Sequence, residues 1–432
     1  MNVQGRGGLS WPPLNSRRAM PTADRLRANV SRLQVMSFTW MFMLHMPIVV
    51  PFLKVHGLGL SAVYQLQAIF ALAVVVLEVP SGYVSDLLGR RGCLLVAGLV
   101  HGLAFTMFAV AETLAGFAAF QLLAAVGVSL YSGTDVALMY DSLEALDDVE
   151  GRRRVLGRRL LWMQSGETVA ALVASILLFD SLQTVAWANA IVGWAPFFVA
   201  LTLVEVPRPL LDRKSHLENV RIITRTLWNS STLLRAILLN LVVYGLATYM
   251  AVWAFQGFWE EAGVPVAWFG VLWAAYNLTV ALVGRVGHSI EDALGTPAVV
   301  GLIGALPVVG WIGLALGGLE VGNPRVWVTV GIIAGFSFQV GRGLTQTVIK
   351  DALNVRVGPE MRATANSVAS LGVRLGFAVL GPGLGFLVDG YGYPRAFGAA
   401  AILFLVLMLT INRFLVRELA SGPAGGAGPA KA

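Results

Sequence analysis

The sequence contains little charge for its length. Only 13% of its 432 residues are Asp, Glu, Lys or Arg, whereas 56% are hydrophobic, and the mean hydropathy is +0.72. A soluble domain carries roughly 25% charged residues, so this composition excludes an ordinary soluble protein and indicates lipid as the surrounding medium. Apolar runs near the length that spans a bilayer as a helix recur from residue 34 almost to the C-terminus.

Cysteine and the motifs of enzymes are also scarce. The single cysteine, Cys93, excludes an intrachain disulfide. The sequence contains no H-E-x-x-H, no G-x-S-x-G and no G-x-x-x-x-G-K-[ST], and the lack of the last argues against ATP hydrolysis by this chain. We therefore expect no enzymatic activity, no metal and no cofactor. An enzyme embedded in the membrane and acting on lipid is the alternative from another class, and it would need a cluster of His, Ser or Asp at one membrane face.

The long apolar runs predict an all-α membrane protein with twelve transmembrane helices in two six-helix bundles. Backbone groups in lipid must be hydrogen-bonded within their own segment, and the runs are too long and too little alternating for barrel strands. The expected spans are 34–53, 61–85, 92–112, 115–140, 160–179, 184–204, 235–257, 266–288, 297–318, 326–349, 361–387 and 395–416.

A polar loop in the middle divides six spans from six. This plan suggests an internal duplication, as in many secondary transporters. The expected parts are a cytoplasmic basic N-terminal segment (1–33), an N-terminal six-helix bundle (34–204), a cytoplasmic linker (205–233), a C-terminal six-helix bundle (234–417) and a disordered tail (418–432).

The formal charge of +7 has an uneven distribution that predicts orientation. With the N-terminus inside, 25 of the 31 Lys and Arg residues fall in cytoplasmic segments, three in outside loops and three within spans. Positive charge gathers on the cytoplasmic side of membrane proteins. We therefore expect a multi-pass protein of the cytoplasmic membrane with both termini in the cytoplasm, and we interpret the basic balance as a membrane signal rather than a nucleic-acid footprint.

The stretch GYVSDLLGRRG ends the second span with an acid and two arginines. Gly82 and Asp86 are four positions apart and share one helix face. Gly82 permits close approach of a neighbouring helix, and Asp86 can then meet the positive N-terminus of another helix. Gly89 ends the helix, and Arg90 and Arg91 follow it.

This pattern, G-x-x-x-D-x-x-G-R-R, resembles the signature loop of the major facilitator superfamily, and SGTDVALMYDSL and RATANSVASLGVRLG resemble segments of its bacterial members. The resemblance covers nearly the whole chain and implies a transporter. It also implies that the loop is a gate latch whose arginine pairs with Asp141 at the inner end of the fourth span. The second half departs from the pattern, because GHSIEDALGTP keeps Glu291, Asp292 and Gly295 without an arginine pair.

Polar residues within spans are expensive and usually functional. The resemblance places spans 1, 4, 7 and 10 around a central cavity, and two of these spans carry polar or aromatic stripes at helical spacing. Such residues suit a small amphipathic molecule. An aromatic belt at the outer interface is the alternative for Tyr249 and Trp253, and packing is the alternative for His45. The predicted cavity residues are His45, Asp135, Tyr249, Trp253, Gln256, Gln339, Arg342 and Gln346.

Two ion pairs are also predicted. The resemblance makes the fifth and eighth spans neighbours, so we expect Glu167 and Arg285 to form an ion pair when the inner side is closed and to separate when it opens. Asp135 and Arg342 have matching expected depths and opposite charges, so we expect them to pair when Asp135 is deprotonated and to separate when a proton or a charged substrate arrives, which would couple transport to protons. The alternative is that Arg342 holds an anionic substrate while Asp135 braces the fourth helix beside Gly133. The predicted function is secondary active transport of a small organic molecule by alternating access, with proton-coupled efflux as the first choice and metabolite uptake or facilitated diffusion as the alternative. We expect a monomer surrounded by lipid.

Overall fold

The computed structural model describes residues 21–148, 151–207, 228, 231–319, 323–357 and 361–421. These described residues form helices and connecting turns, without a strand. Eleven of their helical stretches are long and apolar enough to cross a membrane. The remaining expected span, the tenth (326–349), corresponds to α14 (Pro324–Leu344), which is also of membrane-spanning length. The structure thus confirms the predicted all-α membrane fold.

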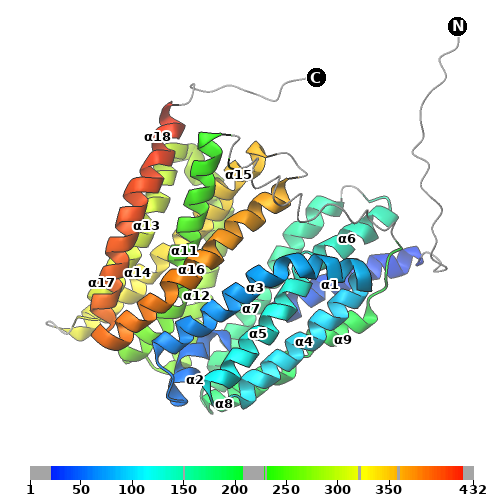
Figure 1. The fold of residues 1–432 in the computed structure, drawn as a ribbon, viewed down its shortest axis with the longest axis horizontal. Coiled ribbons are helices and arrows are strands. Elements are labelled where there is room, and N and C mark those ends of the chain that lie inside the picture. The colour runs from blue at the N-terminus through cyan, green and yellow to red at the C-terminus, as the bar shows by residue number, and fades with distance from the viewer. Residues whose placement is uncertain are drawn as a thin grey trace, which may run out of the picture.

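The first half of the chain, up to residue 207, forms six spans (Figure 1). Its elements are α1 (Ala23–Met41), η1 (Met46–Ile48), α2 (Val49–Val55), α3 (Leu60–Leu88), α4 (Arg90–Val110), α5 (Leu114–Tyr131), α6 (Thr134–Ala145), α7 (Gly151–Leu177), α8 (Leu182–Val192) and α9 (Ala195–Thr202).

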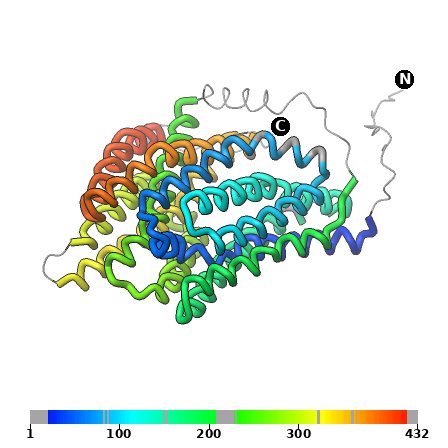
Figure 2. Tube along the Cα trace, turned by 60° about the horizontal axis from the view of Figure 1, so that its bottom comes forward, coloured from blue at the N-terminus to red at the C-terminus, as the bar shows by residue number. Residues whose placement is uncertain are grey.

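The second half, from residue 231, forms the other six. Its elements are α11 (Thr232–Glu261), η2 (Val266–Trp268), α12 (Phe269–Leu294), α13 (Thr296–Gly317), α14, η3 (Thr345–Ile349), α15 (Lys350–Arg356), α16 (Arg362–Tyr391), α17 (Tyr393–Leu407), η4 (Met408–Asn412) and α18 (Arg413–Ser421). Figure 2 shows the two halves side by side, with blue to green in one and green to red in the other.

Three spans that the hydrophobic pattern suggests are continuous are in fact interrupted. The first breaks before Pro47 and the sixth before Pro196, because proline lacks the N–H that a helix interior needs. The fourth breaks at Gly133, whose φ of 81° is left-handed. The break at Gly133 reorients the inner part of the fourth span, α6, relative to α5.

The first helix begins at Ala23 rather than at residue 34, so the described part of the N-terminal segment is helical. The reason is visible at Asn29, whose side chain is fully buried. Its Nδ2 donates to the carbonyl of Val204 at 2.9 Å and to Ser142 Oγ at 3.2 Å, and its Oδ1 accepts from the Val204 N–H. The linker, the N-terminal residues 1–20 and the tail beyond residue 421 lie largely or wholly outside the described residues.

We call the two ends of the molecule the basic end and the far end. The basic end holds the start of α1, the turns at Gly89 and Gly295, and α18. The far end holds the turns at Gly57, Gly263 and Gly392. Figure 1 shows α6, α15 and α18 at the basic end and α2 and α8 at the far end.

Candidate functional site: a cavity between the two halves

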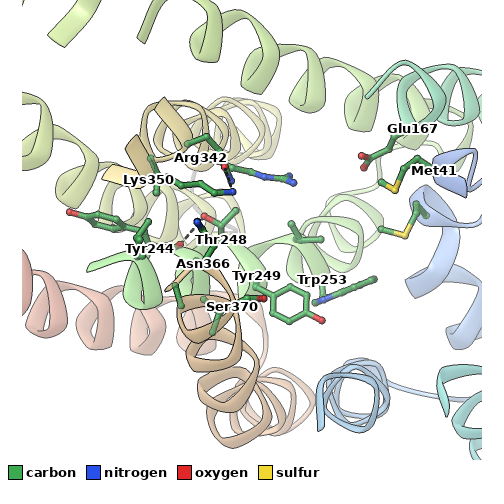
Figure 3. A pocket seen from close by; sticks show the side chains of 18 of the residues that line it. Met41, Glu167, Tyr244, Thr248, Tyr249, Trp253, Arg342, Lys350, Asn366 and Ser370 are labelled. Carbon is green, nitrogen blue, oxygen red and sulfur yellow. Dashed lines mark hydrogen bonds between the residues drawn. The ribbon is translucent and has the colours of Figure 1, made fainter. Parts of the chain in front are cut away.

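A cavity of about 540 Å³ lies between the two halves. Thioethers of Met41 and Met46 line it from the first span, and aromatic rings line it from α11 and α12. Figure 3 shows the charged side chains of α14, α15 and α7 around the same space. Its volume lies in the usual range of small-molecule sites, about 300–1,000 Å³.

The aromatic wall comes mainly from α11. Tyr249 and Trp253 are four positions apart, and their ring centroids lie 6.4 Å from each other. Tyr249 also packs on Phe377 of α16 at 4.4 Å between centroids. Trp253 is buried, and both rings line the cavity. The structure therefore favours the cavity interpretation of these two residues over the interface belt.

A cationic patch, which we define as Arg342, Gln346 and Lys350, forms the adjoining wall. Lys350 follows Arg342 by eight positions, which in a regular helix would turn it about 80° away. The segment Thr345–Ile349 forms a π turn, which takes up one more residue than an α turn. Lys350 therefore comes within about 20° of Arg342, and all three side chains line the cavity.

The two cations of the patch differ in their hydrogen-bond partners. Lys350 Nζ donates to Gln346 Oε1 at 3.3 Å. Arg342 is half-buried, and within the described part of the chain no side chain or carbonyl forms an ion pair or hydrogen bond with its guanidinium. A cation of the second half thus faces the cavity without a protein partner. Glycine helps the π turn pack, because a Cβ at Gly287 would lie 2.2 Å from Thr347 Oγ1.

Glu167 of α7 is the acid in the cavity wall. Its Oε1 accepts from Trp273 Nε1 at 3.2 Å and from Asn277 Nδ2 at 3.0 Å, and only 8% of the residue is exposed. Both donors belong to α12, so these bonds connect the two halves. The fifth and eighth spans are thus neighbours, as expected.

The ion pair predicted between Glu167 and Arg285 is not formed in this conformation, and its formation in a state closed at the inner side stays a prediction. Arg285 lies eight positions beyond Asn277 on α12, which is ~12 Å nearer the basic end, and it is exposed. The depth comparison failed because α7 begins at Gly151 rather than at residue 160, which places Glu167 deeper than expected. Neutral donors satisfy its carboxylate instead.

The predicted pairing of Asp135 with Arg342 is also absent. Asp135 lies in the first turn of α6, is fully buried, and forms an ion pair with Arg159 of α7 at 2.5 Å. The left-handed residue Gly133 just before it redirects the helix, so the carboxylate meets an arginine of its own half. Asp135 is not part of the cavity wall.

Three further predicted cavity residues lie elsewhere. His45 packs among Phe105, Phe108 and Phe120 with ring centroids 4.7–5.8 Å apart, which agrees with its packing alternative. Gln339 is 3% exposed and is not in the cavity wall. Gln256 is fully buried at the contact between the halves.

Gln256 belongs to a seal at the far end. Its Nε2 donates to the carbonyl of Met46 at 2.7 Å, and its Oε1 accepts from the Val50 N–H at 3.0 Å. Nearby, Lys54 Nζ lies 3.2 Å from Glu260 Oε2. All three contacts join the first span to α11, and they close the space between the halves at this end.

A carboxylate that the sequence interpretation missed completes the seal. Asp389 of α16 accepts from the N–H groups of Leu60 at 3.1 Å and Ser61 at 3.0 Å, which begin α3. Gly59 leaves room, since a Cβ there would lie 2.7 Å from Asp389 Oδ2. The available signal was an acid in the last turn of a span, directly before a glycine turn. Acids stabilise helix N-termini.

At the basic end, the structure brings together part of the predicted latch. Arg90 Nη1 lies 2.9 Å from Asp141 Oδ2. Gly89 has a φ of 77° and lets the chain turn directly from α3 into α4. Gly82 and Asp86 lie within α3, but their side chains fall outside the described residues.

Glu205 is a member of this cluster that the sequence interpretation did not find. Its carboxylate accepts from the Arg90 N–H at 3.0 Å and the Arg91 N–H at 2.8 Å, and so caps the N-terminus of α4. Arg91 Nε in turn donates to the carbonyl of Leu203 at 2.7 Å. Glu205 is the first residue of the predicted linker (205–233), and nothing in the sequence around an isolated glutamate there indicates that it caps a helix.

Comparison with known proteins gives one family and many structures of one fold. The family model of the Major Facilitator Superfamily matches residues 33–357. No curated protein matches the sequence. Among solved structures, the nucleoside transporter NupG is similar with a TM-score of 0.72 and 13% identity over 89% of this chain and 98% of that chain.

Two other similar structures have comparable values. A bacterial homologue of the human lysosomal transporter Spinster, inward-facing and unoccupied, has a TM-score of 0.69 and 16% identity over 93% of this chain and 98% of that one. A D-xylose-proton symporter has a TM-score of 0.67 and 13% identity over 91% of this chain and 98% of that chain. At such identities the likeness to solved structures establishes the fold alone.

Proposed function

Because this chain belongs to the Major Facilitator Superfamily, we propose that it moves a small organic molecule across the cytoplasmic membrane by alternating access. One observation carries the proposal: the halves are joined by Gln256, by Lys54 with Glu260 and by Asp389 at the far end, while a cavity large enough for a small molecule lies between them. Rocking of the two halves about such a cavity exposes it to each side in turn.

The positive-inside distribution orients this arrangement. The segments expected in the cytoplasm hold 25 Lys and Arg residues and those expected outside hold three, so we assign the basic end to the cytoplasm. The described conformation is then an inward-facing state, sealed towards the outside. We propose that the protein works as a monomer, since both six-helix halves that alternating access requires are present in one chain.

Export is our first choice of direction. In the inward-facing state the cavity accepts a molecule from the cytoplasm, which is the first step of export. An uptake carrier passes through the same state when it releases its substrate, and two of the similar structures are a nucleoside transporter and a xylose–proton symporter. The experiment below therefore measures both directions.

We propose protons as the coupling ion and Glu167, rather than Asp135, as the group that carries them. Glu167 is an acid of the cavity wall whose hydrogen bonds to Trp273 and Asn277 connect the two halves. A carboxylate that accepts hydrogen bonds is weakened as an acceptor when it binds a proton. Protonation thus changes the contact between α7 and α12, which a buried acid inside one half would not do.

Flux in proteoliposomes tests the proposal. The purified protein is reconstituted, a panel of organic anions, cations and neutral compounds is supplied, and a pH gradient is imposed in each direction. We expect uphill movement of one compound class with one gradient sign, and Glu167→Gln should lose uphill movement while retaining downhill exchange. As a control, Arg325→Gln, whose side chain is exposed and outside the cavity wall, should retain both. No flux of any compound would contradict the transport proposal.

A further inference from the structure

Resting on the proposed transport function, we propose that the substrate is a small organic anion. Its anionic group binds between Arg342 and Lys350, and its apolar or aromatic body lies against Tyr249, Trp253 and the thioether of Met46. The juxtaposition that carries this inference is a pair of cations on one wall of the cavity and aromatic rings on the adjoining wall (Figure 3).

The charge balance of the cavity favours an anion. Its lining holds two cations, Arg342 and Lys350, against one acid, Glu167. The acid already accepts two hydrogen bonds from α12, whereas Arg342 has no bonding partner within the described ranges. A half-buried cation without a counter-charge is less well solvated than one in bulk water, and an anionic ligand offsets that cost.

The backbone also points to a built site. A regular helix would turn Lys350 away from Arg342, and the π turn at Thr345–Ile349 returns it to the same side. Such single π turns occur often at functional sites. The packing around the π turn agrees with this, because Gly287 has no Cβ and so leaves room for Thr347 of that turn.

The two amides near the cations are partly used in contacts within the protein. Asn366 Nδ2 donates to Asn354 Oδ1 and to the carbonyl of Arg362, both at 2.8 Å. Gln346 Oε1 accepts from Lys350. One polar atom of each amide is therefore engaged with the protein, and among the described residues of the cavity wall Arg342 is the cation whose donors have no protein partner. A planar guanidinium suits a carboxylate or phosphate group, which it can bind through two hydrogen bonds.

A cysteine placed in the cavity measures its potential without knowledge of the substrate. Ser370 lines the cavity beside Asn366 and is exposed there, so Ser370→Cys is a nearly isosteric probe. The native Cys93 is fully buried, which keeps background labelling low. The rates of an anionic and a cationic methanethiosulfonate are measured and each is divided by its rate with a free small thiol. The ratio cancels differences in access and in thiolate content.

We expect the anionic reagent to be favoured in the Ser370→Cys protein. Adding Arg342→Gln or Lys350→Gln should lower the anionic-to-cationic ratio by about fivefold or more, because a unit charge at close range alters the two rates in opposite directions. Adding Arg325→Gln, an arginine at the far end of the same helix, should leave the ratio unchanged. A preference for the cationic reagent, or equal ratios in all four proteins, overturns the inference.

A second arm uses three matched ligands at millimolar concentration: 3-phenylpropionate, 3-phenylpropionamide and 2-phenylethylamine. We expect the acid to slow labelling by a neutral reagent more than the amide or the amine does, and Arg342→Gln to remove this protection. Equal protection by acid and amide, or no protection by the acid, counts against the inference. If a neutral or cationic compound is transported and the cavity favours the cationic reagent, the anionic-substrate inference fails and the transport proposal stands. If no compound is transported and the cavity favours the anionic reagent, the transport proposal fails and the anion-binding site stands.

Discussion

The fourth and the tenth spans occupy equivalent places in the two halves, and each carries one ionisable residue deep in its inner part. In the first half, Asp135 is fully buried and paired with Arg159 of the same half. In the second half, Arg342 faces the cavity and no described residue pairs with it. The first half uses its deep charge to hold its own helices together, whereas the second half presents its charge to the space between the halves.

The basic-end turns show the same division. Gly89 has φ 77° and ψ 161°, and Gly295 has φ 83° and ψ 146°, so the backbone turns alike in both halves. Around Gly89, the carboxylates of Glu205 and Asp141 bind the arginines that follow. Around Gly295, Glu291 Oε1 accepts from the hydroxyl of Thr296 at 2.8 Å, and its Oε2 lies 3.6 Å from Nδ1 of the exposed His288. The fold repeats while the polar chemistry is concentrated in the first half.

The largest expected effect distinguishes the two deep charges. Asp135→Asn leaves Arg159 without its partner, and breaking a buried ion pair destabilises by about 3–5 kcal/mol. Arg342→Gln removes a cation that has no protein partner, so the unfolding temperature should stay the same or rise, while transport is lost. Thermal unfolding of the detergent-purified proteins checks both. The double variant Asp135→Asn, Arg159→Gln should recover part of the loss, and equal destabilisation by Asp135→Asn and Arg342→Gln would remove the distinction.

The next effect compares the two glycine turns. Both residues lie in a backbone region that side chains rarely adopt, which costs of order 1–3 kcal/mol for alanine. A Cβ at Gly89 would also lie 2.9 Å from Glu205 Oε2, whereas a Cβ at Gly295 would meet nothing within 4 Å. Gly89→Ala should therefore lower the unfolding temperature more than Gly295→Ala and should also reduce flux. Equal shifts would mean that the Glu205 contact contributes nothing.

The number of helices and the division into halves were predictable from the sequence. A span in lipid must hydrogen-bond its own backbone and carry apolar side chains, so each span appears in the sequence as a long apolar run. The positions of Tyr249 and Trp253 were also predictable, since helical spacing places them on one stripe. Gln256 continues that stripe but lies in the far-end seal, because the cavity stops where the halves make contact. Periodicity indicates a shared face and does not show what lies opposite.

The partners of the charges were not predictable. Matching depths suggested Arg342 for Asp135, but the left-handed turn at Gly133 aims α6 at Arg159. The early start of α7 moved Glu167 away from Arg285. Breaks, helix starts and the π turn depend on tertiary packing, so a segment's composition carries little sign of them.

A smaller effect concerns the acids beside the two turns. Glu205→Gln removes a charge from the N-terminus of α4, where a carboxylate accepts from two N–H groups, and charge-assisted bonds to a helix start contribute about 1–2 kcal/mol. Glu291→Gln keeps an oxygen that can accept from the Thr296 hydroxyl and loses only a long contact with the exposed His288, so its loss should stay below about 0.5 kcal/mol. Unfolding midpoints in detergent measure the two values. A larger loss at Glu291 would reverse the comparison between the turns.

The smallest effect on stability concerns two ion pairs, and it separates bonds within a half from bonds between halves. Arg90 with Asp141 lies inside the first half, and Lys54 with Glu260 joins the halves at the far end. Partly exposed pairs contribute about 0–1 kcal/mol, so neither Asp141→Asn nor Glu260→Gln should lower the unfolding temperature measurably.

Only the pair between the halves differs directly between conformations, because Lys54 and Glu260 separate when the far end opens. Conformations of this kind differ by a few kcal/mol, and losing up to about 1 kcal/mol from the sealed state raises the open population up to about fivefold. Spin labels at the far-end loops should therefore show more long distances in Glu260→Gln. Asp141→Asn should act on this distance distribution only indirectly and less. A larger far-end shift in Asp141→Asn than in Glu260→Gln would contradict this prediction. It would mean that the Arg90–Asp141 pair, which lies within one half, affects the equilibrium between the conformations more than the Lys54–Glu260 pair does.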